Sequence, residues 1–303
     1  KIGLVDEDGK FWHTSEYPVN FDGYETPILE TVARSCSCFL TEHRIYPQQL
    51  TAAGVSATGY INTEKGTVDG GGGFIRNWTG SHIRERLETD FRIPVSVIND
   101  ANAAALGEVW LGAARGRKNV VMLTIGTGVG GGIITDSRLL QGRSGFAGEI
   151  GHMVIHRGGK RCHCGSRGCL EKYASMTALV EEVRRAVTEG KVEGILPEEV
   201  NGRWIFEQIG RGNETLARMA DEWMSDIAAG IVNLVYIFNP ETVILGGGVS
   251  SQKELFIDRI REKTVAMLPE LFTRDLEIVA ASLANRAGMA GAVYYCMKCK
   301  ERD

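Results

Sequence analysis

Apolar residues follow two spacings along the chain. Short apolar runs bounded by turn residues predict strands, whereas apolar residues at every third or fourth position predict helices. Strands are expected at residues 2–5, 11–17, 50–56, 95–98, 120–125, 130–135, 242–245 and 277–281, with a turn at 137–140 leading into a further strand. Helices are expected at residues 24–43, 81–90, 100–113, 177–189, 214–238, 253–267 and 288–298. Asn213 is expected to cap the longest helix, and residues 66–73 form a glycine-rich loop.

The order of these elements predicts an α/β protein with an internal duplication. Hairpin strands followed by helix–strand alternation occur twice, and the second series begins near Leu111. Because helices must cover the apolar faces of a sheet, this order favours two α/β domains. The recurrence of the pattern also indicates a cleft between the two halves.

The composition narrows the class of protein. Hydrophobic residues make up 43% of the 303 residues, which is typical of a packed globular protein. The 34 basic and 38 acidic residues give a net charge of −4, which argues against nucleic acid as the main partner. No apolar run is long enough to span a membrane, and no signal peptide opens the sequence.

The cysteines indicate a cytoplasmic protein with a metal site. Seven unevenly spaced cysteines do not suit a secreted disulfide scaffold. Cys36 and Cys38 are expected as free thiols in a helix. Cys296 and Cys299 form a C-x-x-C, but no strand precedes it, so spare cysteines on a terminal helix are favoured over a redox motif.

The segment from Glu149 to Glu171 carries the strongest chemical signal. Three cysteines lie within eight residues and a histidine precedes them, in the order His152, Cys162, Cys164, Cys169. Thiolates and a neutral imidazole are the ligands of a closed tetrahedral zinc site. Glu149 and Glu171 bracket the cluster and would serve as hydrogen-bond acceptors for a polyhydroxylated ligand. We therefore expect a zinc-held loop that presents carboxylates to a substrate.

Two glycine runs follow predicted strands. The residues Gly126, Gly128 and Gly131 fit G-x-G-x-x-G formally, but a strand rather than a helix follows, so a hairpin with a glycine tip is favoured over a dinucleotide site. Backbone amides at such a tip can bind phosphate, and Thr127 can add a hydroxyl. Tight turns alone explain many such runs. A second run, 246–248, favours close approach of a nucleotide to the backbone over an ordinary turn.

Asp100 lies where a strand ends and a helix starts. Two roles are open for it: an N-cap, or a general base at the carboxyl end of a strand, where open α/β sheets bind ligands. Asn99 could orient a hydroxyl beside it. The stretch 54–59, which ends at Gly59, could line the same cleft or form a turn. After the glycine-rich loop, Asn77 precedes Trp78, an aromatic expected in the core rather than against a ligand.

Together these motifs resemble the bacterial ROK family of sugar kinases. The residues that carry the resemblance are Asn99-Asp100-Ala-Asn102, Gly126-Thr-Gly-Val-Gly-Gly-Gly132, Gly148-Glu149-Ile-Gly151-His152, Cys162-x-Cys164-Gly-x-x-Gly-Cys169-x-Glu171, Gly246-Gly-Gly248 and Ala287-Gly-Met-Ala-Gly-Ala292. The resemblance implies a duplicated actin-like, ribonuclease-H-like ATPase fold with an interdomain cleft. The implied domains are residues 1–110 with 288–303, and residues 111–287 with the zinc loop.

The resemblance also implies a role for each motif. Asp100 would be the catalytic base, and zinc would be held by His152, Cys162, Cys164 and Cys169. The sugar hydroxyls would be bound by Asn99, Glu149, His152 and Glu171, with Gly59 and Asn77 lining the same site. ATP, with Mg²⁺, would meet Gly126, Thr127, Gly128, Gly130, Gly131, Gly132 and Gly247. His152 would use one ring nitrogen for the metal and the other for the sugar.

One family motif is expected but not found. The family opens with a strand and the turn Asp-x-Gly-Gly-Thr-x-x-Lys, and residues 1–5 resemble the strand that comes after that turn. We expect either that roughly a dozen residues are missing ahead of Lys1 or that the protein is truncated there, and a truncated protein would be a poor catalyst.

The expected reaction is phosphoryl transfer from ATP to a hexose, at the 6-hydroxyl, with glucose the first choice. N-acetylmannosamine, N-acetylglucosamine and fructose remain alternatives. The sugar-binding body of a transcriptional repressor is an alternative of another class, although no helix-turn-helix segment is present here. A homodimer is expected because the long helix 214–238 has exposed sides and because members of the family often form homodimers.

Overall fold

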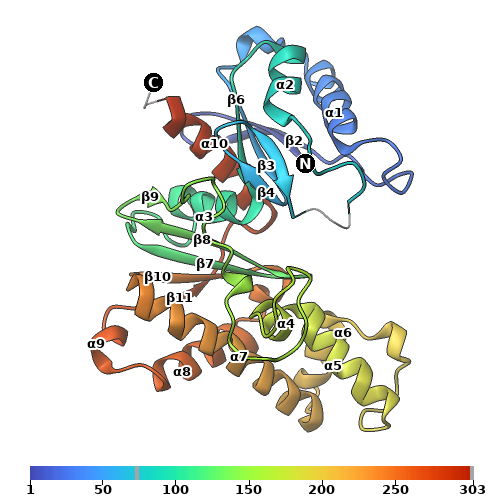
Figure 1. Cartoon of the computed structure of the whole chain (residues 1–303), viewed down its shortest axis with the longest axis vertical. Helices are drawn as coiled ribbons and strands as arrows, with labels where there is room; N and C mark the ends of the chain where they lie inside the picture. Colours follow the sequence, from blue (N-terminus) through green and yellow to red (C-terminus); the bar gives the residue numbers. More distant parts are fainter. Residues whose placement is uncertain (72–74, 301–303) are drawn as a thin grey trace.

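The computed structural model describes residues 1–71 and 75–300 and is an elongated α/β molecule (Figure 1). Its largest sheet has five strands in the order β11-β10-β7-β8-β9. The strands β7 (Val120–Ile125), β10 (Thr242–Gly246) and β11 (Glu277–Ala280) run parallel, while β8 (Val129–Thr135) and β9 (Arg138–Leu139) continue the sheet as an antiparallel hairpin beside β7. The hairpin expected from the glycine run at 126–132 is thus confirmed.

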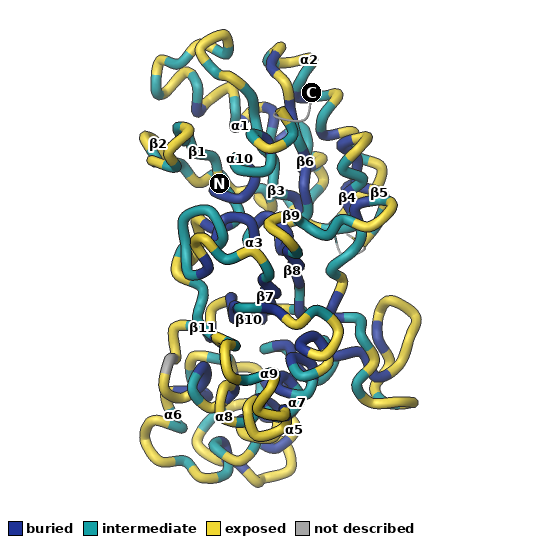
Figure 2. Tube along the Cα trace, turned by 90° about the vertical axis from the view of Figure 1, so that its left-hand side faces the viewer, coloured by how far each residue is buried: buried dark blue, intermediate teal, exposed yellow. Residues whose placement is uncertain are grey.

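Alternate residues of β7 explain why this sheet is covered on both faces. Val121, Leu123 and Ile125 pack in one core with the helices α5 (Met176–Thr188) and α7 (Glu214–Phe238). Val120 and Met122 point the opposite way, into a core with α3 (Asp100–Leu111) and α10 (Ala287–Lys300). A strand buried on both faces must be apolar throughout, which is the pattern that its sequence shows. Figure 2 shows this burial as dark blue along β7 and β8.

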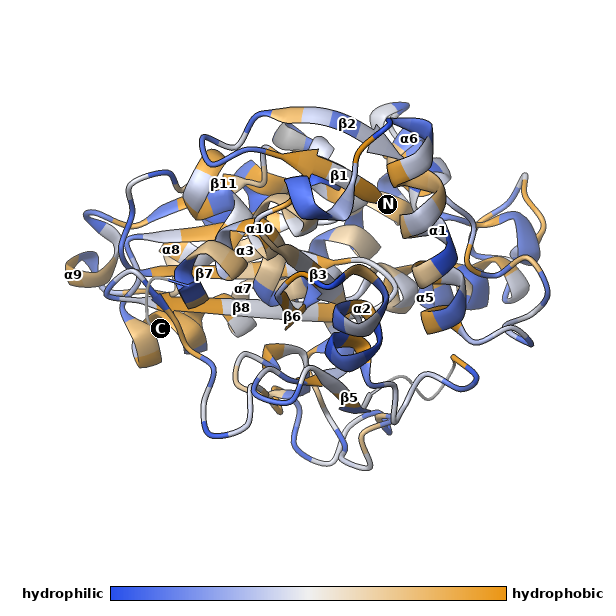
Figure 3. Cartoon of the chain, turned by 90° about the horizontal axis from the view of Figure 1, so that it is seen from above, coloured by the Kyte–Doolittle hydropathy of each residue, from blue (hydrophilic) through white to orange (hydrophobic). Residues whose placement is uncertain are grey.

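The N-terminal part of the chain is built from three two-stranded sheets. β1 (Ile2–Val5) pairs antiparallel with β2 (Phe11–Ser15), β3 (Ala53–Ala57) pairs parallel with β6 (Val95–Asn99), and β4 (Tyr60–Asn62) pairs antiparallel with β5 (Thr67–Gly70). The helices α1 (Ile28–Glu42) and α2 (Ile83–Phe91) pack on this part through a separate core, and Figure 3 shows the polar outer surface of α2.

The two parts share a strand pattern. In the large sheet, β7 joins an antiparallel pair, β8 and β9, to a parallel pair, β10 and β11. The N-terminal part has the matching pairs, β1 with β2 and β3 with β6. Within residues 1–71 and 75–300, no strand joins β1 to β3 in the way that β7 joins β8 to β10. Helix α10 contacts both β1 and β3.

Helices α3 and α10 lie between the two parts and pack very closely (Figure 1). Glycines permit this approach. A Cβ atom added at Gly107 would lie 2.2 Å from the carbonyl oxygen of Ala287, and one added at Gly291 would lie 1.6 Å from that of Ala103. Glu108, fully buried on α3, accepts hydrogen bonds from the backbone amides of Ser282 and Leu283 and so fixes the segment before α10.

Several boundaries differ from the sequence prediction for local reasons. The first helix begins at Ile28 rather than residue 24 because Pro27 precedes it and disfavours a helical residue before it. The expected strand 50–56 is β3, and residues 47–49 form a single 3₁₀ turn. Residues 67–70 of the expected glycine-rich loop form β5, since β4 offers a pairing edge; Gly72 and Gly73 lie outside the described residues. The expected helix 253–267 starts as a π-helical turn, Lys253–Asp258, and continues as α8, Arg259–Ala266.

Five short α-helices and strands of the described residues were not predicted. They are β4, β5, α4 (Glu171–Ala174), α6 (Gly202–Gly210) and α9 (Glu270–Thr273). The longest helix, in contrast, has the predicted bounds, and the Asn213 side chain accepts a hydrogen bond from the backbone amide of Leu216 as its predicted cap. None of the helices in the described part has both the length and the hydropathy of a membrane span.

Candidate functional site

Asp100 stands at the carboxyl end of β6, beside the carboxyl end of β3. The two strands are parallel, and Ala57 pairs with Asn99, so the residues that follow each strand share one edge. Asn99, not Asp100, caps α3: its Oδ1 accepts hydrogen bonds from the amides of Ala101 and Asn102. The N-cap interpretation of Asp100 is therefore wrong by one residue, and the Asp100 side chain remains exposed.

Two hydrogen bonds orient the Asp100 carboxylate. Its Oδ2 accepts from the hydroxyl of Thr58 at 2.7 Å, and its Oδ1 accepts from the amide of Ala101 at 2.9 Å. The side-chain amide of Asn99 donates to the carbonyl of Gly59 at 3.1 Å, which ties the turn after β3 to the start of α3. Thr58 was not predicted; its place after a strand, next to Gly59, was the available signal.

The segment 148–152, which holds Glu149 and His152, lies against the buried side chain of Asn102 on α3. A Cβ atom added at Gly148 would lie 3.4 Å from Oδ1 of Asn102, and Gly148 has the left-handed φ of +92°. A Cβ atom added at Gly151 would lie 2.0 Å from the carbonyl oxygen of Val129. The segment that holds Glu149 and His152 is thus pressed between α3 and the start of β8, and glycine is needed on both sides.

The four predicted metal ligands converge. One ligand atom from each of His152, Cys162, Cys164 and Cys169 lies within 4.8 Å of all the others. The Cys164 and Cys169 sulfurs are 3.7 Å apart, and Nδ1 of His152 is 3.6 Å from the Cys162 sulfur. Tetrahedral zinc with Zn–S bonds of about 2.3 Å separates its ligand atoms by about 3.8 Å, so this donor set fits the ion.

Short backbone contacts fold the loop around this cluster. The amide of Cys162 donates to the carbonyl of Ser166, and the amide of Gly165 returns to the carbonyl of Cys162. A Cβ atom at Gly168 would lie 1.7 Å from the carbonyl oxygen of His156, where the glycine has a φ of +81°. Cys162 and Cys169 are buried residues and Cys164 is an exposed one, so the cluster lies at the surface on the side of Cys164.

Glu149 and Glu171 face the same region as Asp100. Desolvation, together with the charges of Asp100 and Glu171, raises the pKa of Glu149 to about 7. Glu171 accepts a hydrogen bond from the amide of Val129 at 3.2 Å and lies 3.3 Å from Nδ1 of His163. Burial lowers the pKa of His152, while the Glu171 charge acts in the opposite direction. The two glutamates and His152 therefore form one cluster of polar groups.

An aromatic pair that was not predicted from the sequence lies near Glu149 and Glu171. The rings of Tyr60, on β4, and Phe146, in the loop before Glu149, have centroids 5.7 Å apart. Desolvation raises the pKa of the Tyr60 hydroxyl, and the charges of Glu149, Cys164 and Glu171 contribute. Tyr60 thus brings the N-terminal part of the chain to the metal loop. Tyr60 carries no signal in the sequence, because this residue follows the turn glycine Gly59 and belongs to no periodic apolar pattern or motif.

The predicted phosphate-binding residues fall into two groups. Gly126, Thr127 and Gly128 form the tip between β7 and β8, and Glu171 would collide with a side chain at Gly128. The other three, Gly130, Gly131 and Gly132, lie inside β8. A Cβ atom at Gly132 would lie 2.5 Å from the side chain of Ala105 and one at Gly130 would lie 2.9 Å from that of Ala101, so these two glycines admit α3 against the sheet. A Cβ atom at Gly131 would lie 2.6 Å from the carbonyl oxygen of Gly148, so this glycine admits the segment that holds Glu149 on the opposite face.

Gly247 lies next to this tip. It has a φ of +96°, and a Cβ atom there would lie 1.9 Å from the carbonyl oxygen of Ile125. The carboxyl ends of β7 and β10 are neighbours, so the two predicted nucleotide loops share one edge of the large sheet.

Gly59 and Asn77 lie at turns of the N-terminal part. Gly59 has a φ of +108° and its carbonyl is bound by Asn99, beside Asp100. Asn77 is exposed and has a φ of +56°. Its neighbour Trp78 is buried, and its indole donates to the carbonyl of Thr58 at 2.8 Å. Trp78 therefore belongs to the core, as predicted, and supports the residue that holds Asp100.

Comparison with known proteins identifies the family of this chain. Residues 1–298 match the sequence pattern of the ROK family. The chain belongs to the ROK family. A glucokinase from Thermotoga maritima is 34% identical over 301 residues, which cover 96% of this chain and 92% of the relative. A xylose repressor from Caldicellulosiruptor bescii is 32% identical over 253 residues, which cover 82% of this chain and 62% of the repressor.

Solved structures agree with this assignment. A ROK family glucokinase from Streptomyces griseus, in complex with glucose and AMPPNP, superposes with a TM-score of 0.81 at 32% identity, covering 97% of this chain and 94% of that one. The predicted family and the actin-like fold of ROK sugar kinases are thereby confirmed. The exact domain boundaries, residues 1–110 with 288–303 and residues 111–287, stay a prediction.

Proposed function

We propose that this ROK protein transfers the γ-phosphoryl group of ATP to the 6-hydroxyl of a hexose, with Asp100 as the general base. The chain is an ATP-dependent sugar kinase by its family and by its 34% identity to a glucokinase. The assignment of Asp100 as the base rests on one observation. The carboxylates of Asp100 and Glu171 are close enough to Glu149 to affect its pKa, and the Cys₃His cluster lies beside them.

Each carboxylate has a separate task in this proposal. Asp100 would accept the hydroxyl proton as the sugar oxygen attacks phosphorus, a contribution of about 10²–10⁴-fold to the rate. Its bonds to Thr58 and Ala101 fix the carboxylate without consuming both lone pairs of either oxygen. Glu149, Glu171 and His152 would bind the other hydroxyls, with Gly59 and Asn77 at the rim. The Asn99 side chain is engaged by the backbone of α3 and Gly59, which favours a supporting role beside the sugar.

Zinc would be held by His152, Cys162, Cys164 and Cys169. Its contribution is structural: it would fix the imidazole and the loop that ends in Glu171, so that their polar atoms keep one arrangement. The loop between His152 and Glu171 consists mostly of turns and buries few apolar side chains. A closed metal site would supply the stability that such a loop lacks.

The nucleotide would lie at the edge shared by the two glycine loops. The amides at Gly126, Thr127 and Gly128 lie at the open end of the sheet and would bind phosphate oxygens, while Gly247 would lie near the adenosine. Gly130 and Gly132 would contribute indirectly by keeping α3 close to the sheet, and Gly131 by keeping the segment that holds Glu149 close to β8. Magnesium would accompany the phosphates of ATP.

Glucose is the first choice of substrate, because the cluster offers several acceptors for a ring of hydroxyls. N-acetylmannosamine, N-acetylglucosamine and fructose remain alternatives. A panel of these four sugars in a coupled assay of ADP release would rank them by kcat/KM. Glucose should give the highest value, and a clear preference for an N-acetylated sugar would contradict the choice.

The decisive variant is Asp100→Asn. It preserves shape, and the cap on α3 belongs to Asn99, so the fold should persist. We expect glucose affinity within a few-fold of wild type and a fall in kcat of about 10²–10⁴-fold. Sugar affinity is measured by calorimetry and turnover by ADP release. Substantial remaining turnover would show that Asp100 is not the base.

Repression is the second function found among relatives. The match to the xylose repressor covers 62% of that protein, so the shared part is the body that both types possess. Sugar binding without ADP release in protein that carries its natural N-terminus, under conditions where magnesium and ATP are saturating, would favour a sensor over a kinase.

We also propose a homodimer. Tyr236 and Ile237 on α7 and Leu271 on α9 are 51%, 65% and 80% exposed, and the rings of Tyr236 and Phe272 are in contact. Exposed apolar groups gathered in this way are typical of protein contacts. Light scattering should give twice the chain mass, and Leu271→Glu should shift the protein toward monomers.

A further inference from the structure

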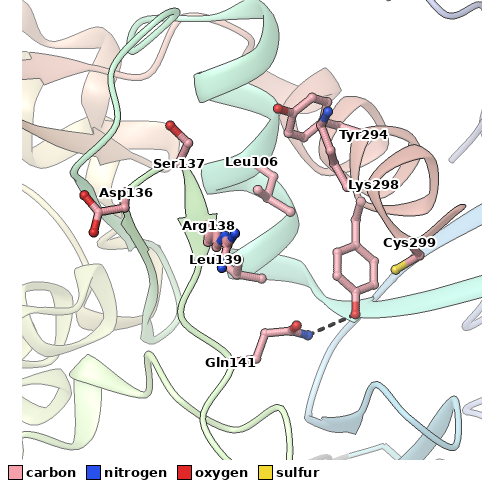
Figure 4. A pocket seen from close by; sticks show the side chains of 10 residues that line it. Leu106, Asp136, Ser137, Arg138, Leu139, Gln141, Tyr294, Lys298 and Cys299 are labelled. Atoms are coloured by element: carbon pink, nitrogen blue, oxygen red, sulfur yellow. Dashed lines mark hydrogen bonds between the residues drawn. The ribbon is translucent and has the colours of Figure 1, made fainter. Parts of the chain in front are cut away.

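A pocket outside the candidate catalytic site opens between α10, α3 and β9 (Figure 4). It has a volume of about 360 Å³, within the range of small-molecule sites. Its lining includes Ser137, Arg138, Gln141, Tyr295, Lys298 and Cys299, none of which has a role in the proposed phosphoryl transfer.

The pocket follows from the way the two helices diverge. At Gly107 and Gly291 the backbones of α3 and α10 touch. Further toward the C-terminus of α10, the rings of Trp110 on α3 and Tyr294 on α10 stack with centroids 5.4 Å apart. The two aromatic side chains lie between the helices there and keep their backbones apart. Leu106 of α3 forms the floor of the space that results (Figure 4).

A tight turn fixes the opposite wall. Asp136 and Ser137, which connect β8 to β9, have φ angles of +49° and +63°. Left-handed conformations at both central residues define the two-residue hairpin turn that suits the twist of antiparallel strands. The turn places Arg138 at the pocket, while Figure 4 shows the Asp136 carboxylate pointing away from Tyr294 and Lys298.

The lining contains two basic residues, Arg138 and Lys298, and one acidic residue, Asp136, so basic groups are in excess. Arg138 and Lys298 bring positive charge from two different elements, β9 and α10, and the Lys298 ammonium lies 5.5 Å from the ring centroid of Tyr294. Ser137 and Tyr295 add hydroxyls, and Gln141 adds an amide. Arginine and lysine together are the usual partners of phosphate, and neutral donors and acceptors suit hydroxyl groups.

We propose that this pocket binds a small phosphorylated anion that also carries hydroxyl groups, of the class of sugar phosphates. The phosphate lies between Arg138 and Lys298, and the hydroxyls meet Tyr295 and Gln141. Inorganic phosphate shares the charge but lacks the hydroxyl-bearing part, so it binds more weakly.

Gln141 connects the pocket to the sugar side of the molecule. Its side-chain amide donates to the Tyr295 hydroxyl at 2.9 Å and to the Thr63 hydroxyl at 3.2 Å, and Thr63 follows β4, which carries Tyr60. The backbone carbonyl of Gln141 accepts from the amide of Ala147, two residues before Glu149. The side chain of Gln141 thus contacts the segment after β4, and its backbone contacts the loop that holds Glu149, which gives a ligand in this pocket a route of two contacts to the sugar side.

Cys299 provides a local probe of occupancy. It lines the pocket and is half-buried, whereas Cys38 is exposed on α1 and serves as an internal reference in the same chain. The experiment measures alkylation rates of both thiols by peptide mass spectrometry. The probes are glucose 6-phosphate, inorganic phosphate, glucose, and glucose with a non-hydrolysable ATP analogue, each added to the full chain.

At a concentration of about ten times its Kd, glucose 6-phosphate should slow Cys299 alkylation about tenfold and leave Cys38 unchanged. At the same glucose 6-phosphate concentration, Arg138→Ala and Lys298→Ala should each leave only about twofold protection, because loss of a charged hydrogen-bond donor weakens the affinity about tenfold. Arg157→Ala, an exposed arginine of the metal loop, is the matched control and should keep the protection.

Three results would overturn the proposal. One is an unchanged Cys299 rate with glucose 6-phosphate at millimolar concentration. Another is equal protection by glucose with the ATP analogue, which would mean that a conformational change in the catalytic site covers the thiol. The third is full protection in the Arg138→Ala, Lys298→Ala double variant, with melting temperature confirming its fold. None of these readouts requires kinase activity, so the result is independent of the proposed reaction.

Discussion

The Thr58 hydroxyl donates a 2.7 Å hydrogen bond to Oδ2 of Asp100. The two residues are 42 positions apart in the sequence and follow two strands that pair in parallel. Behind them, the buried indole of Trp78 donates to the carbonyl of Thr58. A core aromatic, a hydroxyl and a carboxylate thus form a chain of contacts that orients an exposed acid group.

Thr58→Val should test this orientation. Valine keeps the shape of threonine but removes the donor, so the Asp100 carboxylate gains rotational freedom while the sugar-binding groups stay in place. We expect kcat to fall about tenfold or more, with a smaller change in KM, because misplacement of a reacting group is costly. Thr58→Ser, which keeps the hydroxyl, should retain most of kcat in the same assay. Equal rates for the valine and serine variants would refute the positioning role.

Asn99→Ala should destabilise the protein through the lost helix cap. The Asn99 side chain accepts bonds from two amides of α3, and removal of such a cap typically costs about 1 kcal/mol. Asn99→Asp, which can still accept both bonds, should lose less. Urea unfolding of the three proteins measures the difference, and an unchanged midpoint for the alanine variant would contradict the assignment.

Removal of the metal should disorder the loop between His152 and Glu171. A chelator should release about one zinc ion per chain, since the four ligands form one closed site. We expect a lower melting temperature and weaker sugar binding, both restored by added zinc. Cys164→Ser should contain little zinc, whereas Cys38→Ser, which alters an exposed thiol far along the sequence, should match wild type. A metal content unaffected by Cys164→Ser would exclude the proposed ligand set.

The raised pKa of Glu149 predicts a pH-dependent effect on stability. The pKa rises from 4.5 to about 7 on folding, so the folded state disfavours the charged form. The contribution of Glu149 to stability is complete below about pH 4.5 and is lost progressively as the pH rises through 7. Glu149→Gln avoids this loss.

The melting temperature of Glu149→Gln, measured without sugar, should therefore exceed that of wild type by more at pH 8 than at pH 5. Glu181→Gln, a change at an exposed position on α5, should show no such difference between the two pH values. A wild-type advantage that grows with pH would reverse the predicted sign.

Glu108→Gln should be strongly destabilising. The Glu108 carboxylate is fully buried and accepts hydrogen bonds from the amides of Ala113, Ser282 and Leu283 and from the Ser282 hydroxyl. Glutamine would turn an NH₂ group toward one of these donors, and each unsatisfied buried group costs about 1–3 kcal/mol. Calorimetric unfolding measures the loss. A loss of unfolding free energy no larger than that caused by Glu181→Gln, a substitution at an exposed position, would contradict this prediction.

The sequence predicted the parts of the site that are encoded locally. Metal-ligand spacing, strand-to-helix junctions and glycine runs depend on neighbouring residues, so His152, Cys162 and Asp100 could be identified from short segments. The sequence left two roles open for Asp100, and only the backbone geometry excludes the N-cap, because Asn99 and Asp100 are both residue types that cap helices well.

The residues that sequence reasoning missed act through distant partners. Thr58 becomes informative only when β3 pairs with β6, and Tyr60 only when its ring meets Phe146, which lies far along the chain. Gly130 and Gly132 resemble phosphate-binding residues in sequence, but the fold places them under the small side chains of α3. A glycine required for close packing and one required for a ligand cannot be distinguished before the tertiary structure is known.

The unequal exposure of the cluster's sulfurs has a chemical consequence. Cys162 and Cys169 are buried residues, whereas Cys164 is an exposed one. Oxidants and competing thiophilic ions such as cadmium would therefore make first contact with a single atom, and ligand exchange would start from that side. Carbohydrate phosphorylation by this protein would then respond to heavy-metal or peroxide stress through one exposed sulfur, well before the bulk of the molecule was damaged.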